Sequence, residues 1–294
     1  MPTARHIRAL LRNRQLPTGD IRVNDMLSVV TVRSEKAYAR IIRVRPPELP
    51  EGVTFVDSRA LSGRATLQIG GDTMPILAPD VVRYVGEPIG LLVGPDREKL
   101  LSLREDMQVI YEEFEPQFSL TDHADAKPYQ HLTKTVGDVD EAFVSAHEIV
   151  ERSTRTGVQE HFYPDPHAAY ARIREDGRLE VTCATQWPHH VRRTVAEATG
   201  IAQANIKVYA IEPGQSLEGK VWYPSLVASH AALASRARRA PCLLVYDRSE
   251  DLLVSPKRPA TYLRYRAALD EQGQTLAIDA SIQYDTGAYP VMTD

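Results

Sequence analysis

The chain begins with short apolar or alternating runs that glycine and proline interrupt. Residues 27–32 and 89–93 are two examples, and such runs are typical of β-strands. The stretch after residue 96 has a helical pattern instead. After Asp96, a residue type that caps helices, Leu100 and Leu103 recur at helical spacing, which predicts a helix ending near residue 107. We therefore expect a strand-rich segment that contains one helix.

These elements predict a first domain over residues 21–118, preceded by an N-terminal arm of residues 1–20. Residues 112–134 are polar and irregular, contain two prolines and show no sustained periodicity, which is typical of a linker. A second domain is predicted over residues 135–294.

The second domain alternates predicted strands and helices. Asp138 and Glu141 have the spacing of a capping box before a short helix. Another helix is predicted from Pro188 to Gly200, because proline suits the first helical turn and glycine suits the residue after the last. The longest helical stretch covers residues 224–238. Strands are expected at residues 148–150, 168–173, 179–185, 206–211 and 243–245.

The last part of the pattern is a pair of alternating runs over residues 262–289. Residues 270–273, with the sequence Asp-Glu-Gln-Gly, join the runs and predict a hairpin. Its final strand is expected at a sheet edge that another segment or chain covers. The mixture of strands and helices predicts an α+β fold.

Composition narrows the class of protein. The chain has 294 residues, 43% hydrophobic and 25% charged, with a formal net charge of -4, as expected for a globular protein. Nucleic-acid binding is not expected, because phosphate contacts require a concentrated excess of Lys and Arg. The arginines at positions 5, 8, 12 and 14 are interpreted as a solvated helical arm or a docking segment.

Membrane and metal signals are weak. No run of 18 apolar residues is present and residues 1–20 lack the apolar centre of a secretory signal, so we expect a cytoplasmic protein without a membrane partner. Cys183 and Cys242 lack CxxC spacing and are expected to be buried, reduced thiols. His161 and His167, like the pair at 189–190, lack zinc-motif spacing, so no metal ligand is predicted.

Four segments follow one another in a distinctive order: residues 32–41 with 75–78 and 82–89, residues 137–143 with 159–166, residues 184–188, and residues 214–220. They resemble molybdenum hydroxylases of the xanthine dehydrogenase and aldehyde oxidase family. The resemblance spans essentially the whole chain but less than half of a full subunit. It implies an α/β hammerhead domain at residues 21–118 and an incomplete molybdopterin-binding α+β domain at residues 135–294.

The resemblance also assigns cofactor-binding residues. Gln186 matches a family glutamine whose amide points at an oxo ligand of molybdenum, since an amide donates a hydrogen bond without competing as a ligand. Read by itself, Gln186 is a polar residue at a strand-to-helix turn. The family loop Gly-Gly-Gly-Phe-Gly-Gly-Lys matches residues 214–220, and this match assigns Gly214, Leu217, Gly219 and Lys220 to the cofactor.

This loop departs from the family pattern in a way that affects binding. Three glycines are replaced, by Gln215, Ser216 and Glu218. Glycine lets backbone N–H groups approach a ligand closely, and Glu218 adds a negative charge where the family binds an anionic cofactor. We expect this chain alone to bind the cofactor weakly.

The predicted substrate site follows the same resemblance. Arg258 matches an arginine that purine-oxidising members use on substrate, but Val221 and Pro259 replace the glutamate and histidine found in those members. Xanthine is therefore not favoured, and a small heteroaromatic or aldehyde substrate is expected. No residue matches the family's general-base glutamate, so no catalytic residue is predicted.

The resemblance implies a molybdopterin-binding subunit or fragment of an enzyme that hydroxylates its substrate with oxygen from water. A partner chain would carry the remaining molybdopterin domain and the base, and further subunits would carry iron-sulfur and FAD groups. The alternative is a non-catalytic remnant that keeps the fold and an interaction surface without a cofactor. The replaced glycines favour this alternative.

Overall fold

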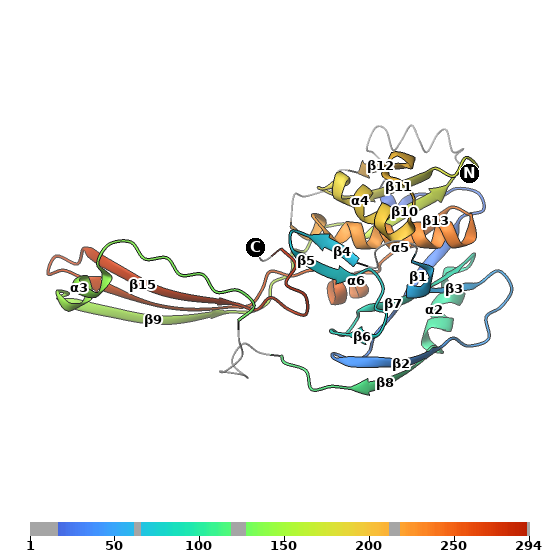
Figure 1. The fold of residues 1–294 in the computed structure, drawn as a ribbon. Helices are drawn as coiled ribbons and strands as arrows, with labels where there is room; N and C mark the ends of the chain where they lie inside the picture. Colours follow the sequence, from blue (N-terminus) through green and yellow to red (C-terminus); the bar gives the residue numbers. More distant parts are fainter. Residues whose placement is uncertain (1–16, 62–65, 119–127, 212–217, 293–294) are drawn as a thin grey trace. The chain divides into compact units, whose positions relative to one another are not determined.

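The computed structural model describes residues 17–61, 66–118, 128–211 and 218–292. The chain forms two compact units, drawn in Figure 1. The first unit combines Met1–Pro116 with His161–Pro256, and the second combines Gln117–Glu160 with Lys257–Thr293. The units therefore differ from two domains that follow one another along the chain. The boundaries predicted from the sequence stay a prediction.

A mixed seven-stranded sheet forms the centre of the first unit, in the order β12-β11-β10-β13-β1-β7-β3. β1 pairs in parallel with β13 and antiparallel with β7, so strands from both predicted domains share one sheet. β7 is buried along its whole length, as expected for an apolar strand inside a covered sheet. The strands are β1 (Leu27–Arg33), β3 (Thr54–Asp57), β7 (Pro88–Gly94), β10 (Ala168–Ile173), β11 (Leu179–Ala184), β12 (Ile206–Ile211) and β13 (Cys242–Val245).

Helices α4 (Pro188–Thr199) and α5 (Tyr223–Arg238) pack on each other and on this sheet. α5 is buried from Tyr223 to Ser235, and its many alanine and serine residues allow close packing. α2 (Arg97–Glu105) lies against β1 and β7, where Leu100 and Leu103 join the core around Val30. A short helix, α6 (Arg248–Val254), follows β13.

Smaller elements complete the first unit. β2 (Ala39–Arg45) lies between β6 (Val81–Val82) and β8 (Gln108–Glu113), and β4 (Thr66–Ile69) pairs with β5 (Asp72–Pro75). Ala39, Ala78, Val82 and Ile89 form a separate core cluster at this end. Among the described residues, short 3-10 helices connect the elements: η1 (Thr18–Asp20), η2 (Ser58–Ala60), η3 (Gln203–Asn205) and η4 (Glu218–Lys220).

The second unit is a three-stranded antiparallel sheet in the order β15-β14-β9 with one short helix. Its elements are α3 (Val139–Val144), β9 (Glu148–Thr156), β14 (Thr261–Leu269) and β15 (Thr275–Tyr284). The Asp270 carboxylate accepts the N–H groups of Gln272 and Gln274 and so holds the hairpin turn. Among the described hydrophobic residues of this unit, only Ala268 is buried.

Most predicted elements are confirmed. α4 begins at Pro188 and ends before Gly200, whose φ of 71° is the left-handed value that favours glycine. Asp96 and Asp138 cap α2 and α3 through their side chains. The predicted helix of residues 224–238 begins one residue earlier, and the hairpin ends at Tyr284 rather than near residue 289. The predicted N-terminal helix lies outside the described residues.

The mixed α/β composition agrees with the predicted class, whereas the hammerhead architecture stays a prediction. Cys183 and Cys242 are free and buried, as expected, and burial raises the pKa of each thiol to about 12. Within the part of the chain that the structure describes, no helix is long and apolar enough to cross a bilayer.

Candidate functional site

Gln186 lies in the turn between β11 and α4. The Trp187 N–H donates to Thr185 Oγ1 over 3.0 Å, and Pro188 begins the helix. The Gln186 N–H donates to the carbonyl oxygen of Lys220 over 3.0 Å. Gln186 itself is exposed. Its backbone is therefore fixed to the end of the predicted cofactor loop, while its side chain is available to a ligand.

Lys220 is buried, with 1% of its side chain exposed. Its ammonium group donates to the carbonyl oxygens of Asp165 at 2.8 Å and Pro166 at 3.3 Å, and it lies 4.3 Å from the centre of the Tyr163 ring. Burial lowers the pKa of Lys220, although the nearby Asp165 carboxylate opposes this effect. The ammonium group thus holds the loop end in the protein, and a contact with cofactor stays a prediction.

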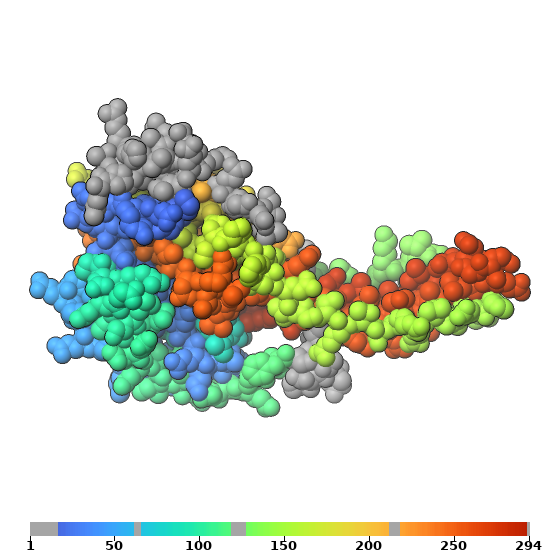
Figure 2. Space-filling view, turned by 180° about the vertical axis from the view of Figure 1, so that it is seen from behind, coloured from blue at the N-terminus to red at the C-terminus, as the bar shows by residue number. Residues whose placement is uncertain are grey.

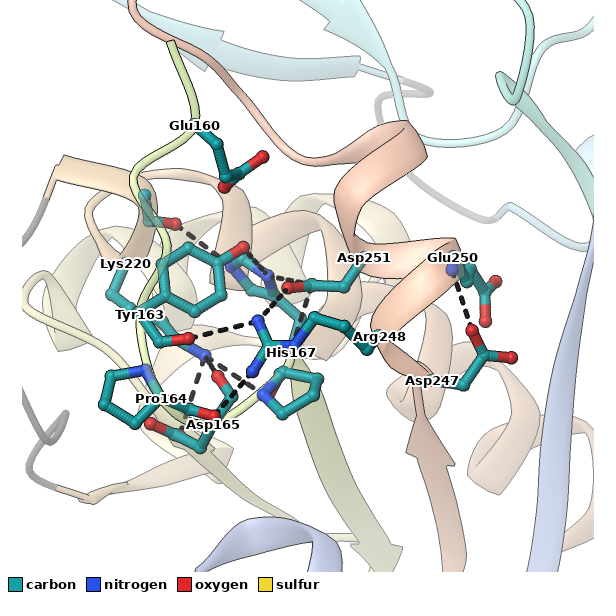
Figure 3. Close-up of polar contacts among 12 residues, drawn as sticks. Glu160, Tyr163, Pro164, Asp165, His167, Lys220, Asp247, Arg248, Glu250 and Asp251 are labelled. Atoms are coloured by element: carbon teal, nitrogen blue, oxygen red, sulfur yellow. Dashed lines mark hydrogen bonds and ion pairs between the residues drawn. The ribbon is translucent and has the colours of Figure 1, made fainter.

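His167 connects three segments of the chain at the centre of Figure 3. Its Nδ1 lies 2.7 Å from Asp251 Oδ1 and 2.8 Å from the Tyr163 hydroxyl, and its Nε2 lies 3.0 Å from the Gly219 carbonyl oxygen. The His167 backbone N–H also donates to Asp251 Oδ1, over 3.1 Å. One imidazole ring therefore joins α6 to the end of the loop.

Burial and hydrogen bonding have opposite effects on the pKa values of His167 and Asp251. Burial lowers the pKa of His167, against the hydrogen bond to Asp251, which raises it. Burial also opposes ionisation of Asp251, but hydrogen bonds from His167 outweigh it and leave the pKa of Asp251 below its usual value. Asp251 is therefore the ionised partner of a buried pair.

Helix α6 holds the same segment from a second side. Arg248 donates to the carbonyl oxygens of Tyr163 at 3.1 Å and Pro164 at 2.5 Å. Together with Lys220 and Asp251, it binds backbone groups of residues 163–167. Figure 3 shows these side chains converging on that segment. The segment is thus a rigid support for the loop end beside Gln186.

Gly219 lies too close to Tyr163 to accept a side chain. A Cβ there would lie 2.9 Å from Tyr163 Cδ1, still closer to Cε1, and 3.2 Å from His161 Cδ2. Tyr163 is 1% exposed and has little room to move. We expect Gly219→Ala to lower the free energy of unfolding by about 1–3 kcal/mol, the usual cost of overpacking.

Urea unfolding followed by tryptophan fluorescence measures this change. Gly71→Ala is the matched control, because no atom lies within 4 Å of its Cβ position. That variant should differ from the parent by less than about 0.5 kcal/mol. Equal losses in the two variants would contradict the assigned role of Gly219.

The structure brings together only part of the predicted site. Gln186, Gly219 and Lys220 lie together, whereas Gly214 and Leu217 fall outside the described residues. Arg258 belongs to the second unit, where its backbone exchanges hydrogen bonds with Gln159 at 2.9 and 3.1 Å. Among the described residues, no group of His, Cys, Asp or Glu side chains could hold a metal ion.

Sequence reasoning missed the network that supports the loop, formed by Tyr163, His167, Arg248 and Asp251. It also missed α6, although Asp247 and Glu250 have the same capping spacing as Asp138 and Glu141. In the structure Asp247 accepts the Glu250 N–H over 2.8 Å. That spacing could have predicted the helix and placed Asp251 in its first turn.

Comparison with known proteins decides the family. Residues 122–294 match the molybdopterin cofactor-binding domain. This chain belongs to that family. The similarity to xanthine dehydrogenases and aldehyde oxidases, first indicated by the ordered segments, is confirmed by the relatives.

Two relatives illustrate the similarity. A xanthine dehydrogenase from Blastobotrys adeninivorans is 31% identical over 269 residues, which are 88% of this chain and 19% of that protein. Aldehyde oxidase 2 from Rattus norvegicus is 28% identical over 273 residues, 90% of this chain and 20% of the relative. This molybdopterin-domain chain therefore spans about a fifth of the length of the relatives that it matches.

Solved structures share the fold. Quinoline 2-oxidoreductase from Pseudomonas putida 86 superposes with a TM-score of 0.77 at 24% identity, over 94% of this chain and 38% of that one. CO dehydrogenase from Oligotropha carboxidovorans gives a TM-score of 0.77 at 21% identity, over 96% of this chain and 39% of its own. At these identities the likeness shows the fold of the chain alone.

Proposed function

We propose that this chain holds one side of the molybdopterin cofactor in a molybdenum hydroxylase. The observation that carries the proposal is the 3.0 Å hydrogen bond from the Gln186 N–H to the Lys220 carbonyl oxygen. It joins the exposed glutamine to the anchored end of the predicted cofactor loop, and it agrees with the family match over residues 122–294.

The residues near Gln186 are compatible with a bound cofactor. Gln186 and Glu218 are exposed, whereas Gly219 and Lys220 are buried against the support formed by residues 163–167. The Gln186 amide and the backbone of the predicted loop, including Gly214 and Leu217, would hold the cofactor. When bound, it supplies the redox chemistry of hydroxylation. The protein contributes a fixed hydrogen-bond donor beside it.

The rest of the active enzyme is proposed to come from other polypeptides. In this proposal a second polypeptide would carry the remaining molybdopterin domain and the general base. Iron-sulfur and FAD subunits would accept the electrons. Arg258 would face a small heteroaromatic or aldehyde substrate. Residues 21–118 would form the hammerhead domain. The complex would be cytoplasmic.

The proposal is tested by the molybdenum and pterin content of the chain purified from its native host with its co-purifying partners. We expect about one molybdenum per complex, and we expect Gln186→Ala to weaken retention of the metal by about 10- to 100-fold, as for other residues that orient metal ligands. Gln203→Ala is the control, since Gln203 is also an exposed glutamine. A metal-free parent complex would overturn the proposal.

One observation favours the alternative, a remnant that binds no cofactor. Glu218 is exposed at the loop end and places a negative charge where an anionic cofactor would lie. If the remnant hypothesis holds, the isolated chain contains no molybdenum, and Glu218→Gly does not restore it. Recovery of molybdenum in Glu218→Gly would instead support an intact but weakened site.

A further inference from the structure

Arg33, the last residue of β1, is a buried arginine that the candidate site does not contain. Its side chain is 10% exposed. Its Nε donates to Glu250 Oε1 over 2.8 Å, and its Nη1 donates to the carbonyl oxygen of Gly86 over 2.9 Å. The guanidinium also lies 4.8 Å from the centre of the Tyr246 ring. Since a guanidinium presents its donors in a rigid plane, Arg33 fixes three segments to one another.

The turn that contains Gly86 packs directly on α6. Gly86 has a φ of 96°, and a Cβ at this position would lie 2.7 Å from Val254 Cγ1 at the end of the helix. The Gly86 N–H donates to the carbonyl oxygen of Ser34 over 2.8 Å, which holds the turn against the end of β1. Helix α6 thus rests on Arg33 at its beginning and on this turn at its end. We call Arg33 and residues 83–87 the α6 seat.

Helix α6 connects its seat to the candidate site. Glu250, which accepts from the seat, precedes Asp251, which accepts the His167 N–H over 3.1 Å. The His167 imidazole in turn lies 3.0 Å from the Gly219 carbonyl oxygen. Figure 3 shows Glu250, Asp251 and Arg248 on the same short helix, next to His167. A displacement of α6 would therefore reach the end of the predicted cofactor loop.

Aromatic rings give a second connection between Arg33 and the site. Tyr246, whose ring lies against Arg33, donates its N–H to the His167 carbonyl oxygen over 3.0 Å, and the two rings lie 6.4 Å apart. The Tyr223 ring lies 4.9 Å from the His167 ring, and all three side chains are buried. Figure 2 shows, within the first unit, orange side chains from the later part of the chain beside blue and teal side chains from its amino-terminal part. A close-packed interior of this kind transmits a displacement instead of absorbing it.

We propose that Arg33 is a positioning residue for the molybdopterin cofactor. This inference rests on the proposed function, in which Gln186 and the loop end lie beside the cofactor. By holding α6 on its seat, Arg33 fixes His167 and the Gly219 carbonyl, and through them the hydrogen bond from Gln186 to the residue after Gly219. Without the guanidinium, the Glu250 carboxylate would lose a buried donor, and α6 would shift from its seat.

Hydrogen exchange at the Gln186 amide of the full chain tests this connection. Arg33→Met removes the charge and the donors but keeps a long side chain. Because the Gln186 N–H donates to the Lys220 carbonyl oxygen, its exchange reports whether the loop end stays in place. We expect this amide to exchange about tenfold faster in Arg33→Met than in the parent, as local opening becomes easier.

Two control variants separate positioning from a general loss of stability. Arg40→Met removes another arginine of an ion pair, since Arg40 lies 2.6 Å from Glu112 between β2 and β8. Leu103→Ala lowers stability through the core around Val30, beside α2. Urea unfolding measures the stability of every variant. Neither control should speed exchange at Gln186 more than about twofold. An unchanged rate in Arg33→Met, or an equal rise in Leu103→Ala, would overturn the inference.

Molybdenum content distinguishes this inference from the proposed function. The complex with Arg33→Met should retain about tenfold less molybdenum than the parent, as for other groups that orient a metal site from outside it. Leu103→Ala should retain the content of the parent wherever it is folded. A parent complex without molybdenum would overturn the proposed function, even if exchange at Gln186 responds to Arg33→Met. Equal molybdenum in the parent and in Arg33→Met would overturn the role of Arg33 alone.

Discussion

An Asp251→Ala variant is expected to lose about 3 kcal/mol of unfolding free energy, because removing a buried acceptor leaves its donors unsatisfied at a cost of about 1–3 kcal/mol each. Asp251 is 1% exposed and accepts both the His167 backbone N–H at 3.1 Å and a contact from Nδ1 at 2.7 Å. Its loss would leave the His167 backbone N–H without this acceptor, and the Tyr163 hydroxyl would be the remaining partner of Nδ1.

Matched changes on the same helix separate this effect from loss of helix capping. Asp247→Ala removes the exposed cap of α6, which accepts the Glu250 N–H, and should cost about 1 kcal/mol. Asp251→Asn keeps an acceptor oxygen and should cost less than Asp251→Ala. Urea unfolding of the three variants measures the differences. If Asp251→Ala loses no more than Asp247→Ala, the His167 and Asp251 pair does not stabilise the fold.

Local chemistry made part of this structure predictable. Asp96, Asp138 and Pro188 each act within four residues of their own position, and the helices begin where these residues predict. Gly200 ends α4 for an equally local reason, its positive φ. Such signals depend on backbone groups nearby in the sequence, so a single chain suffices to read them.

Pairings between distant segments were not predictable in the same way. His167 and Asp251 are 84 residues apart, and β1 pairs with β13, where Leu27 lies opposite Cys242. Hydrophobic alternation shows that a strand has a buried face but does not identify its neighbour. The division into two consecutive domains followed chain order, whereas the sheet combines strands from both.

The candidate site was also predictable only in part from the sequence. Gln186 and the loop residues were found by resemblance to a family motif, and the structure adds the hydrogen bond that joins Gln186 to Lys220. The side chain of Lys220 was expected at the cofactor, but it lies among the carbonyl groups of Asp165 and Pro166. Sequence alone does not show whether a charged side chain points outward or is held internally.

Acid is expected to destabilise the first unit through His230, which lies in α5 and is fully buried. Its Nε2 lies 2.7 Å from the Ile76 carbonyl oxygen and therefore carries the proton of the neutral ring. Its Nδ1 has no hydrogen-bond partner among the described residues. Burial, with a smaller effect from Arg33, lowers the pKa of His230 from 6.5 to about 4.

The direction in which stability changes with pH follows from proton binding to His230. Between pH 6.5 and 4 the unfolded chain binds a proton at His230 that the folded protein excludes, so stability is fully present above pH 6.5 and is lost as pH falls towards 4. The difference between these two values corresponds to about 3 kcal/mol. Burial also lowers the pKa of His167 and His190, which act in the same direction.

Urea unfolding of the parent and His230→Gln at several pH values isolates this contribution. Glutamine keeps an N–H donor for the Ile76 carbonyl but does not titrate, so the variant should lose about 3 kcal/mol less than the parent between pH 6.5 and 4. His189→Gln, at an exposed position on α4, should retain the acid dependence of the parent. If the parent and His230→Gln lose stability equally over this range, protonation of His230 is not the cause, because no other group is changed by that substitution.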